Sequence, residues 1–145
     1  MKKFFQLVVL VFIWGFFSAC ASGPGFMEVN PSLSSDQAEK GRIFFYRPSA
    51  LGAAIQPDVM LNDERVGSAQ SWGFFYVDRP PGGYKVATST EVERTISFIL
   101  EKGQTRFIRF AVSMGFFVGH IYGELVEESV GLSEIKECNY IGEKT

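Results

Sequence analysis

The chain has 145 residues, of which 46% are hydrophobic and 21% charged, enough for one domain with a packed core. Residues 1–19 hold two lysines and no acid, so the remainder carries 12 basic and 16 acidic side chains, a net charge of −4. This composition excludes a disordered chain, a polytopic membrane protein, a disulfide framework and a strongly basic protein, and we expect no nucleic-acid partner.

The N-terminal segment 1–19 has the pattern of a signal peptide. Lys2 and Lys3 precede an apolar run over 4–17, which is interrupted only by Gln6 and Gly15. As a helix, this run reaches roughly 21 Å, less than the roughly 30 Å of a bilayer's hydrocarbon core. The pattern therefore predicts export and not a membrane-spanning helix.

The apolar run ends at 17–20 (FSAC), which resembles a bacterial lipobox with Phe17 at a position where leucine is usual. Small residues before a cysteine leave room for a peptidase, and only cysteine supplies the thiol that receives diacylglycerol. We predict cleavage after Ala19 and a covalent lipid on Cys20, with no other cofactor. The alternative is cleavage after Ala21, within an A-x-A pattern, which would release a soluble protein.

Small uncharged residues follow Cys20. In Gram-negative bacteria, an aspartate directly after the lipidated cysteine commonly retains a lipoprotein at the inner membrane. In this chain the residues after Cys20 are Ala21 and Ser22. We therefore expect the membrane to be a partner through the lipid anchor, and the location to be the outer membrane, facing the periplasm. Residues 20–40 contain proline, glycine and serine without a sustained period, which predicts a lipidated cysteine followed by a flexible tether.

Strand patterns begin at residue 41. The run 42–47 (RIFFYR) is apolar on both faces, so we expect a central strand. Residues 58–61 and 65–68 flank a turn over 62–64, as in a hairpin, and 72–78 predicts a buried strand. The segment 80–84 (PPGGY) then reverses the chain. We expect the ring of Tyr84 to pack at this turn and its hydroxyl to form a hydrogen bond.

Period-two patterns continue toward the C-terminus. Residues 85–90 and 95–100 place Val86, Ile96, Phe98 and Leu100 on an inward face, and 105–112 follows a short turn. Residues 124–140 have a helical spacing of apolar side chains, which Gly131 weakens. The sequence predicts an all-β domain over 41–140, an antiparallel β-sandwich of about seven to eight strands with a short C-terminal helix.

Six short segments occur in a characteristic order and spacing: 41–48 (GRIFFYRP), 56–59 (QPDV), 73–78 (GFFYVD), 80–84 (PPGGY), 113–119 (SMGFFVG) and 134–138 (EIKEC). Over residues 41–138 the chain resembles a family of bacterial lipoproteins known as domain of unknown function 2846. The resemblance implies lipoprotein status and an envelope location. It brings no established activity.

Few residues are suited to catalysis or metal binding. His120 is the only histidine, which excludes a multi-histidine metal site in one chain, and we expect no metal. No nucleophile or phosphate-binding motif is present, so we predict that the protein is not an enzyme. A hydrolase using His120 with Ser113 or Cys138 is a distant alternative. Cys138 otherwise is a buried structural thiol or forms an intermolecular disulfide.

The least ordinary segment is 113–122 (SMGFFVGHIY), where glycines flank three large apolar side chains. One interpretation is a core strand with a bulge. The other is an apolar groove for an acyl chain, a peptide or another lipoprotein, with these candidate binding residues: Met114, Gly115, Phe116, Phe117, Gly119 and His120. We predict a non-catalytic binding or accessory role in the envelope, with an envelope protein as a possible partner. The alternative is a carrier of a small apolar ligand or acyl chain through Phe116 and Phe117.

Overall fold

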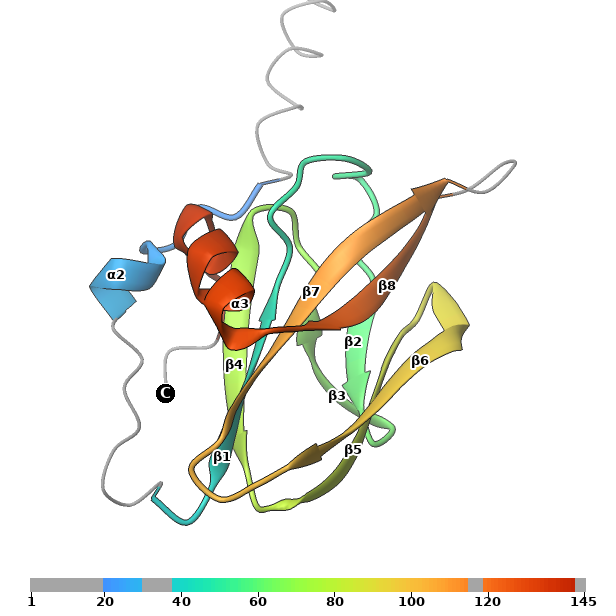
Figure 1. The fold of residues 1–145 in the computed structure, drawn as a ribbon. Coiled ribbons are helices and arrows are strands. Elements are labelled where there is room, and N and C mark those ends of the chain that lie inside the picture. Colours follow the sequence, from blue (N-terminus) through green and yellow to red (C-terminus); the bar gives the residue numbers. More distant parts are fainter. Residues whose placement is uncertain (1–19, 30–37, 115–118, 143–145) are drawn as a thin grey trace, which may run out of the picture.

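The computed structural model describes residues 20–29, 38–114 and 119–142, and the side chains of all of these except 91–93 and 114. Two β-sheets form a sandwich (Figure 1). The larger has the order β8-β7-β1-β4-β9, with β1 (Gly41–Tyr46), β4 (Gly73–Arg79), β7 (Thr105–Met114), β8 (Gly119–Val126) and β9 (Asn139–Tyr140). The smaller has the order β3-β2-β5-β6, with β2 (Asp58–Leu61), β3 (Glu64–Ser68), β5 (Gly82–Thr88) and β6 (Glu91–Leu100). The predicted all-β sandwich is confirmed.

Two strand pairings differ from the purely antiparallel arrangement that the sequence predicted, and the described residues form nine strands. β1 runs parallel to β7, with Phe44 opposite Phe107, and β4 runs parallel to β9, with Phe74 opposite Tyr140. The chain builds β4 and the whole smaller sheet between β1 and β7, so no hairpin turn fixes the relative direction of these two strands. Alternation of apolar residues predicts strands but not their partners.

β1 occupies the centre of the larger sheet, as predicted, and all six of its residues are buried. Ile43 and Phe45 face the smaller sheet, and Phe45 stacks on Phe75 of the neighbouring strand β4 with ring centroids 4.9 Å apart. Phe44 and Tyr46 point to the opposite face and belong to a second apolar cluster. Burial on both faces explains why the strand is apolar without alternation.

The main core lies between the sheets. Val86, Phe98 and Leu100 are buried in it, and Ile96 packs against it partly buried, which confirms the predicted inward face. Each large apolar side chain removed from water in this way stabilises the fold by about 1.5–3 kcal/mol.

The predicted turns are present. Asn62 and Asp63 connect β2 to β3 with φ of 48° and 67°, the left-handed conformation that a two-residue hairpin requires and that asparagine and aspartate tolerate. The hydroxyl of Tyr84 donates a hydrogen bond of 2.7 Å to the carbonyl of Pro80. At this turn the chain crosses from the larger sheet to the smaller one.

The second cluster lies on the outer face of the larger sheet, under α3 (Glu128–Glu134) and the 3-10 helix η3 (Ile135–Glu137), as Figure 1 shows. β8 extends to Val126, beyond the point where the helical spacing was expected to begin. The helix continues through Gly131. A Cβ at this position would lie 2.3 Å from Cγ of Phe107, so there is no room for a larger residue. Gly131 therefore lets α3 approach β7 closely, whereas Val130 and Leu132 remain exposed.

Residues 20–29 differ from the predicted flexible tether, since they lie against the sandwich. Ala21 is buried, and the ring of Phe26, in α2 (Phe26–Val29), packs on Phe44 and Phe74 with centroids 5.9 and 5.5 Å apart. Phe26 extends the apolar cluster of the outer face, which supplies the driving force for docking. The folded unit therefore includes residues well before residue 41. Residues 30–37 of the expected tether lie outside the described residues.

Candidate functional site

Cys20 lies at the surface, at one end of the sandwich. It forms an isolated parallel bridge with Ser71, in the segment between β3 and β4, and its side chain is exposed. The backbone N–H of Ala21 donates to the Ser71 carbonyl at 3.0 Å, and Nδ2 of Asn139 donates to the Ala21 carbonyl at 2.9 Å. The thiol is thus accessible although the next residue is held by the domain. Ala19, the predicted cleavage position, lies outside the described residues.

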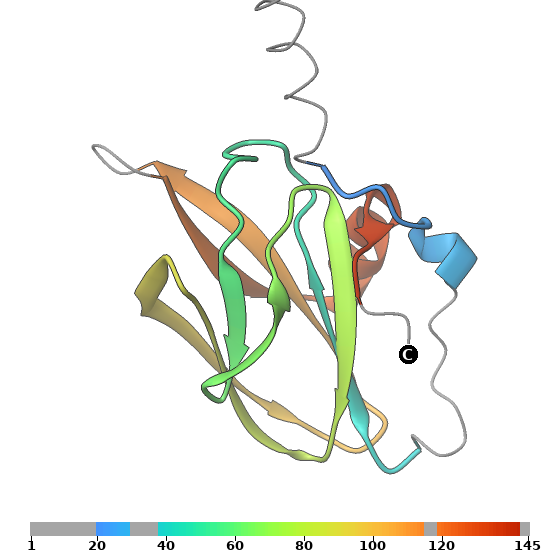
Figure 2. The same ribbon diagram turned by 180° about the vertical axis from the view of Figure 1, so that it is seen from behind.

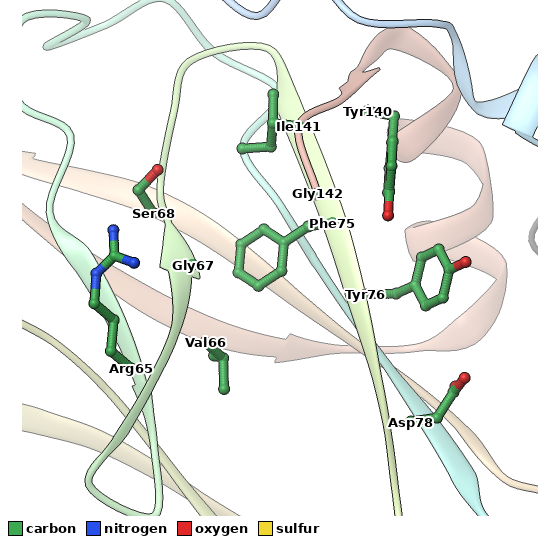
Figure 3. A pocket seen from close by; sticks show the side chains of 10 residues that line it. All are labelled: Arg65, Val66, Gly67, Ser68, Phe75, Tyr76, Asp78, Tyr140, Ile141 and Gly142. Carbon is green, nitrogen blue, oxygen red and sulfur yellow. The ribbon is translucent and has the colours of Figure 1, made fainter. Parts of the chain in front are cut away.

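A cleft of about 590 Å³ opens where the two sheets separate (Figure 3). Its lining comes from β3, β4 and the residues around β9: Arg65, Val66, Gly67, Ser68, Phe75, Tyr76, Asp78, Tyr140, Ile141 and Gly142. β9 pairs with β4 only at Gly73 and Phe74, so among the described residues β4 has no strand neighbour on this side beyond Phe74. The cleft therefore combines aromatic side chains with a strand edge.

One wall of the cleft contains a buried ion pair. Nε and Nη2 of Arg42 donate to the two carboxylate oxygens of Asp78 at 2.7 and 2.8 Å, and both side chains are at least nine-tenths buried. The guanidinium also lies over the ring of Tyr76, 4.1 Å from its centroid. This pairing fixes Tyr76 and Asp78 in place at the cleft, since a bidentate geometry leaves little rotational freedom.

The sequence did not point to this cleft. Phe75 and Tyr76 were interpreted as residues of a buried strand, and nothing local marks Gly67, whose missing side chain makes room for the ring of Phe75. A Cβ at Gly67 would lie 2.6 Å from Cζ of Phe75. The cleft results from the separation of two sheet edges, which no local pattern encodes.

The predicted binding residues that the structure describes lie at the ends of β7 and β8. Met114 pairs with Gly119, and Ser113 with His120, at the ends of the two strands. Gly119 lies close to the loop after β1: a Cβ at this position would lie 3.4 Å from Cδ1 of Ile55. Gly115, Phe116 and Phe117 lie outside the described residues, so the predicted apolar groove is not described.

His120 contacts the turn between β5 and β6. Its Nδ1 lies 3.0 Å from the carbonyl oxygen of Thr90, which only accepts, so Nδ1 carries the proton in this contact. The strand ladder places Ser113 opposite His120. Asp78 and Glu124, either of which a catalytic triad with His120 would need as its third member, are each hydrogen-bonded to an arginine.

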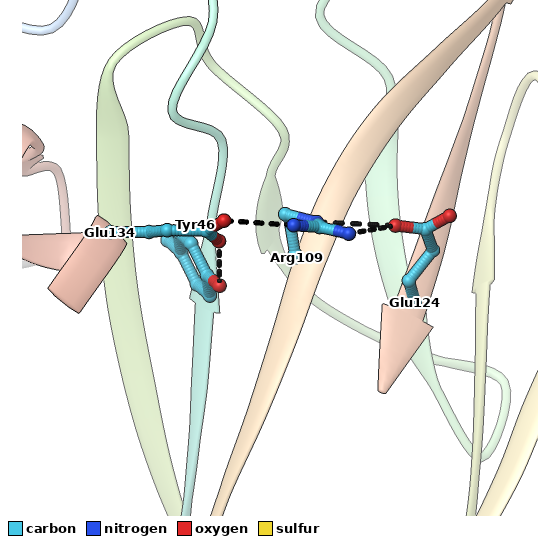
Figure 4. Close-up of polar contacts among 4 residues, drawn as sticks. All are labelled: Tyr46, Arg109, Glu124 and Glu134. Carbon is cyan, nitrogen blue, oxygen red and sulfur yellow. Dashed lines mark hydrogen bonds and ion pairs between the residues drawn. The ribbon is translucent and has the colours of Figure 1, made fainter. Parts of the chain in front are cut away.

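Arg109 connects two acids on the outer face of the larger sheet (Figure 4). It donates to Glu124 at 2.8 and 3.1 Å and to Glu134 at 2.8 Å, and the Tyr46 hydroxyl donates to Glu134 at 2.6 Å. The hydrogen bond to Glu124 raises the pKa of Arg109, and burial, followed by the bond to Glu134, raises the pKa of Tyr46. This network ties α3 to β1, β7 and β8. Glu124 and Glu134, two of the acids near the C-terminus, are therefore paired with Arg109.

Cys138 is fully buried in the outer cluster, in agreement with the interpretation as a structural thiol. Burial raises its pKa to about 12, so the reactive thiolate is scarce at neutral pH. Within the described parts of the chain, no three histidine, cysteine, aspartate or glutamate side chains converge on a common point. The helices in those parts are all too short or too polar to cross a membrane.

Comparison with known proteins assigns the family. The model of the family described as "Protein of unknown function (DUF2846)" matches residues 37–121, and the chain belongs to this family. The chain is also 29% identical over 143 residues to an uncharacterized protein of Haemophilus influenzae (strain ATCC 51907 / DSM 11121 / KW20 / Rd), with 95% of this chain and 85% of that protein covered. No solved structure matches the chain significantly. The resemblance seen in the sequence is thereby confirmed, although the family match ends before segment 134–138.

Proposed function

We propose that the protein is an exported envelope lipoprotein, attached to the outer membrane through a diacylglyceryl thioether on Cys20, with a non-catalytic binding role. The observation that carries the anchor is the tetrapeptide 17–20 (FSAC), directly after the apolar run. In this scheme the thiol of Cys20 displaces the headgroup phosphate of a membrane phospholipid, so that the C–O bond to the phosphate breaks, the thioether to diacylglycerol forms and the headgroup phosphate leaves with the thiol proton. Water then hydrolyses the Ala19–Cys20 bond. Two or more acyl chains satisfy the requirement for stable anchoring.

The contacts of Ala21 support Cys20 as the first residue of the mature chain. Cleavage after Ala21, the alternative, would remove a buried side chain and the two hydrogen bonds that its backbone makes with Ser71 and Asn139. Cleavage before Cys20 keeps both bonds and leaves the exposed thiol at the chain terminus. The fold is therefore compatible with modification at Cys20 without rearrangement.

Substitution of Cys20 by alanine is expected to abolish lipid attachment, because no other atom of the lipobox can form the thioether. Intact mass spectrometry of protein extracted from membranes should show the lipid adduct in the wild type and an unprocessed precursor in Cys20→Ala. Cys138→Ala is the matched control, since it removes the only other cysteine, and should carry the adduct. A lipid-free wild type, or a membrane-bound and processed Cys20→Ala variant, would contradict the proposed anchor.

The cleft supports the binding part of the proposal. Tyr76 and Tyr140 are partly exposed and offer aromatic surface, and the edge of β4 offers backbone donors and acceptors to an extended chain. The two charged side chains among the described lining residues are each ion-paired, Asp78 with Arg42 and Arg65 with Asp58. We propose that the cleft serves recognition of an envelope protein.

A photocrosslinking amino acid in place of Ser68, on the cleft wall, is expected to give a discrete protein adduct in intact cells. The same replacement of Ser97 provides the control, because Ser97 is an exposed serine on β6, at the opposite edge of the same sheet. The adduct masses from both variants are compared by immunoblotting. Equal crosslinking at the two positions, or none at Ser68, would speak against the cleft as the recognition surface.

A further inference from the structure

Three uncharged segments of the chain meet at the end of the sandwich that carries Cys20. These segments, which we call the anchor end, are residues 20–27, 48–57 and 69–72, none of which contains a charged residue. They are joined by the bridge between Cys20 and Ser71 and by backbone hydrogen bonds from Ala69 to Pro57 and from Trp72 to Arg47, each 2.9 Å. Figures 1 and 2 show this grouping from both sides.

The opposite end of the sandwich has the reverse character. The chain enters β1 there, and the β2–β3 and β6–β7 turns lie at the same end (Figure 2). These segments are rich in charge: Glu39, Lys40, Asp63, Glu64, Glu101 and Lys102. Charge is thus distributed unevenly along the long axis of the sandwich, although the net charge of the chain is small.

Three charged residues directly adjoin these segments in the chain: Glu28 and Asp58, whose side chains are exposed, and Arg47, which is removed from solvent. Arg47 is fully buried and donates to the carbonyls of Leu51, Gly52, Ile55 and Ala69, at 2.5–2.9 Å. These bonds fix the loop 48–57 and occupy carbonyls that would otherwise need water. Leu51, in this loop, is nevertheless 56% exposed. A fixed loop with satisfied carbonyls and an exposed apolar side chain can lose water at small cost.

We propose that the anchor end is a membrane-contact surface, which seats the sandwich on the phospholipid bilayer with Leu51 and Trp72 at the interface. The inference rests on the proposed lipidation of Cys20. A residue spans at most about 3.6 Å, and Ala21 is already held by the domain, so lipid chains on Cys20 leave no spacer between bilayer and sandwich. The surface around Cys20 must then meet the headgroups.

The residues of this surface suit the bilayer interface. Tryptophan is enriched at membrane–water interfaces, and Trp72 directly follows Ser71, the partner of Cys20. An uncharged surface escapes both the dehydration of ions and the repulsion between the acidic chain and anionic headgroups, whereas the charged end points to the aqueous side. The partner of this surface is therefore lipid, and the cleft stays open to other proteins.

Fluorescence quenching in vesicles tests the orientation. The chain has two tryptophans, and Trp14 lies in the predicted signal peptide, so Trp72 is the single tryptophan of a chain that begins at Cys20. The purified membrane form is reconstituted into phosphatidylcholine vesicles with brominated or ordinary acyl chains. We expect a loss of Trp72 emission in the brominated vesicles, because bromine quenches only at short range.

Two variants set the direction of the surface. In a Trp72→Phe background, Leu51→Trp places the fluorophore on the anchor end, and Ile99→Trp places it near the charged end, at a side chain 61% exposed. We expect strong quenching of the first variant and none of the second. Thermal unfolding checks that both variants fold, and the wild-type measurement with Trp72 needs no substitution.

Intact mass spectrometry of the same preparation separates the possible failures. A lipid on Cys20 together with unquenched Trp72, or with equal quenching of the Leu51→Trp and Ile99→Trp variants, would overturn the membrane-contact surface and leave the anchor in place. A preparation without lipid on Cys20 would overturn both proposals.

Discussion

Replacement of Arg47 by methionine is expected to lower the free energy of unfolding by about 3–5 kcal/mol. The guanidinium is fully buried, forms no ion pair with a described carboxylate, and donates to four backbone carbonyls of the loop 48–57 and its neighbour Ala69. Methionine fills much of the same space but donates nothing. Each buried carbonyl left without a donor costs about 1–3 kcal/mol, of which relaxation of the loop recovers part. Urea unfolding of the purified protein measures the loss.

Arg106→Met is the matched control for Arg47→Met. The Arg106 guanidinium also bonds a carbonyl, that of Ile99, but at the surface and at 3.1 and 3.3 Å. Water replaces such a donor, so we expect a change within about 0.5 kcal/mol. Arg47→Lys should give an intermediate loss, because an ammonium cannot reproduce the planar arrangement of donors. Equal losses for Arg47→Met and Arg106→Met would contradict the role assigned to the buried guanidinium.

Replacement of Arg42 by methionine is expected to cost a similar amount, about 3–5 kcal/mol, for a different reason. The substitution leaves the carboxylate of Asp78, whose side chain is only 9% exposed, without its cation, and it also removes the contact of the guanidinium with the Tyr76 ring. The larger part of the loss comes from the uncompensated charge. Chemical denaturation of the variant measures the change.

The double variant Arg42→Met/Asp78→Leu distinguishes an unpaired charge from lost packing. It removes both charges, and we expect it to be more stable than Arg42→Met alone, because no carboxylate remains buried without a partner. Arg65→Met provides the comparison at the surface. Nε of Arg65 lies 2.6 Å from Oδ1 of Asp58, a distance similar to that in the buried pair, but the two side chains are 61% and 46% exposed. Removing this surface ion pair should lower the free energy of unfolding by less than about 1 kcal/mol. A double variant no more stable than Arg42→Met would refute this explanation.

The two arginines also connect stability with the proposed function. Arg42 holds one wall of the cleft, and Arg47 holds the loop of the anchor end. The cleft and the anchor end therefore depend on buried cations that the sheet positions, while the exposed residues of both remain available for contact with a partner or with lipid.

Features that depend on local chemistry could be predicted from the sequence. The positive φ of Asn62 and Asp63 follows from the tolerance of these residue types for the left-handed conformation, and the hydroxyl of Tyr84 reaches a carbonyl only four residues away. The burial of Val86, Phe98 and Leu100 follows from their period of two. Each of these predictions needs only a short stretch of chain.

Features that depend on which segments meet could not be predicted in the same way. Phe26 appeared to belong to a tether because its partners, Phe44 and Phe74, are distant in the sequence. In the sequence, Gly131 weakens the helical pattern. In the structure, α3 lies so close to Phe107 that only glycine fits at this position. The parallel pairing of β1 with β7 likewise has no local signal in the sequence, because no turn connects the two strands directly.

By itself the sequence predicts a leader and a lipobox-like tetrapeptide, and it identifies the family and most of the strands, because each is a pattern of neighbouring residues. The tertiary structure alone decided that Arg42 binds Asp78, 36 positions away, and that the buried guanidinium of Arg47 donates to carbonyls of the loop that follows it. It also decided that a cleft opens beside β4 and that the uncharged segments gather around Cys20. The physical reason is that burial and pairing energies act between segments brought together by folding, and apolar periodicity does not specify which segments these are.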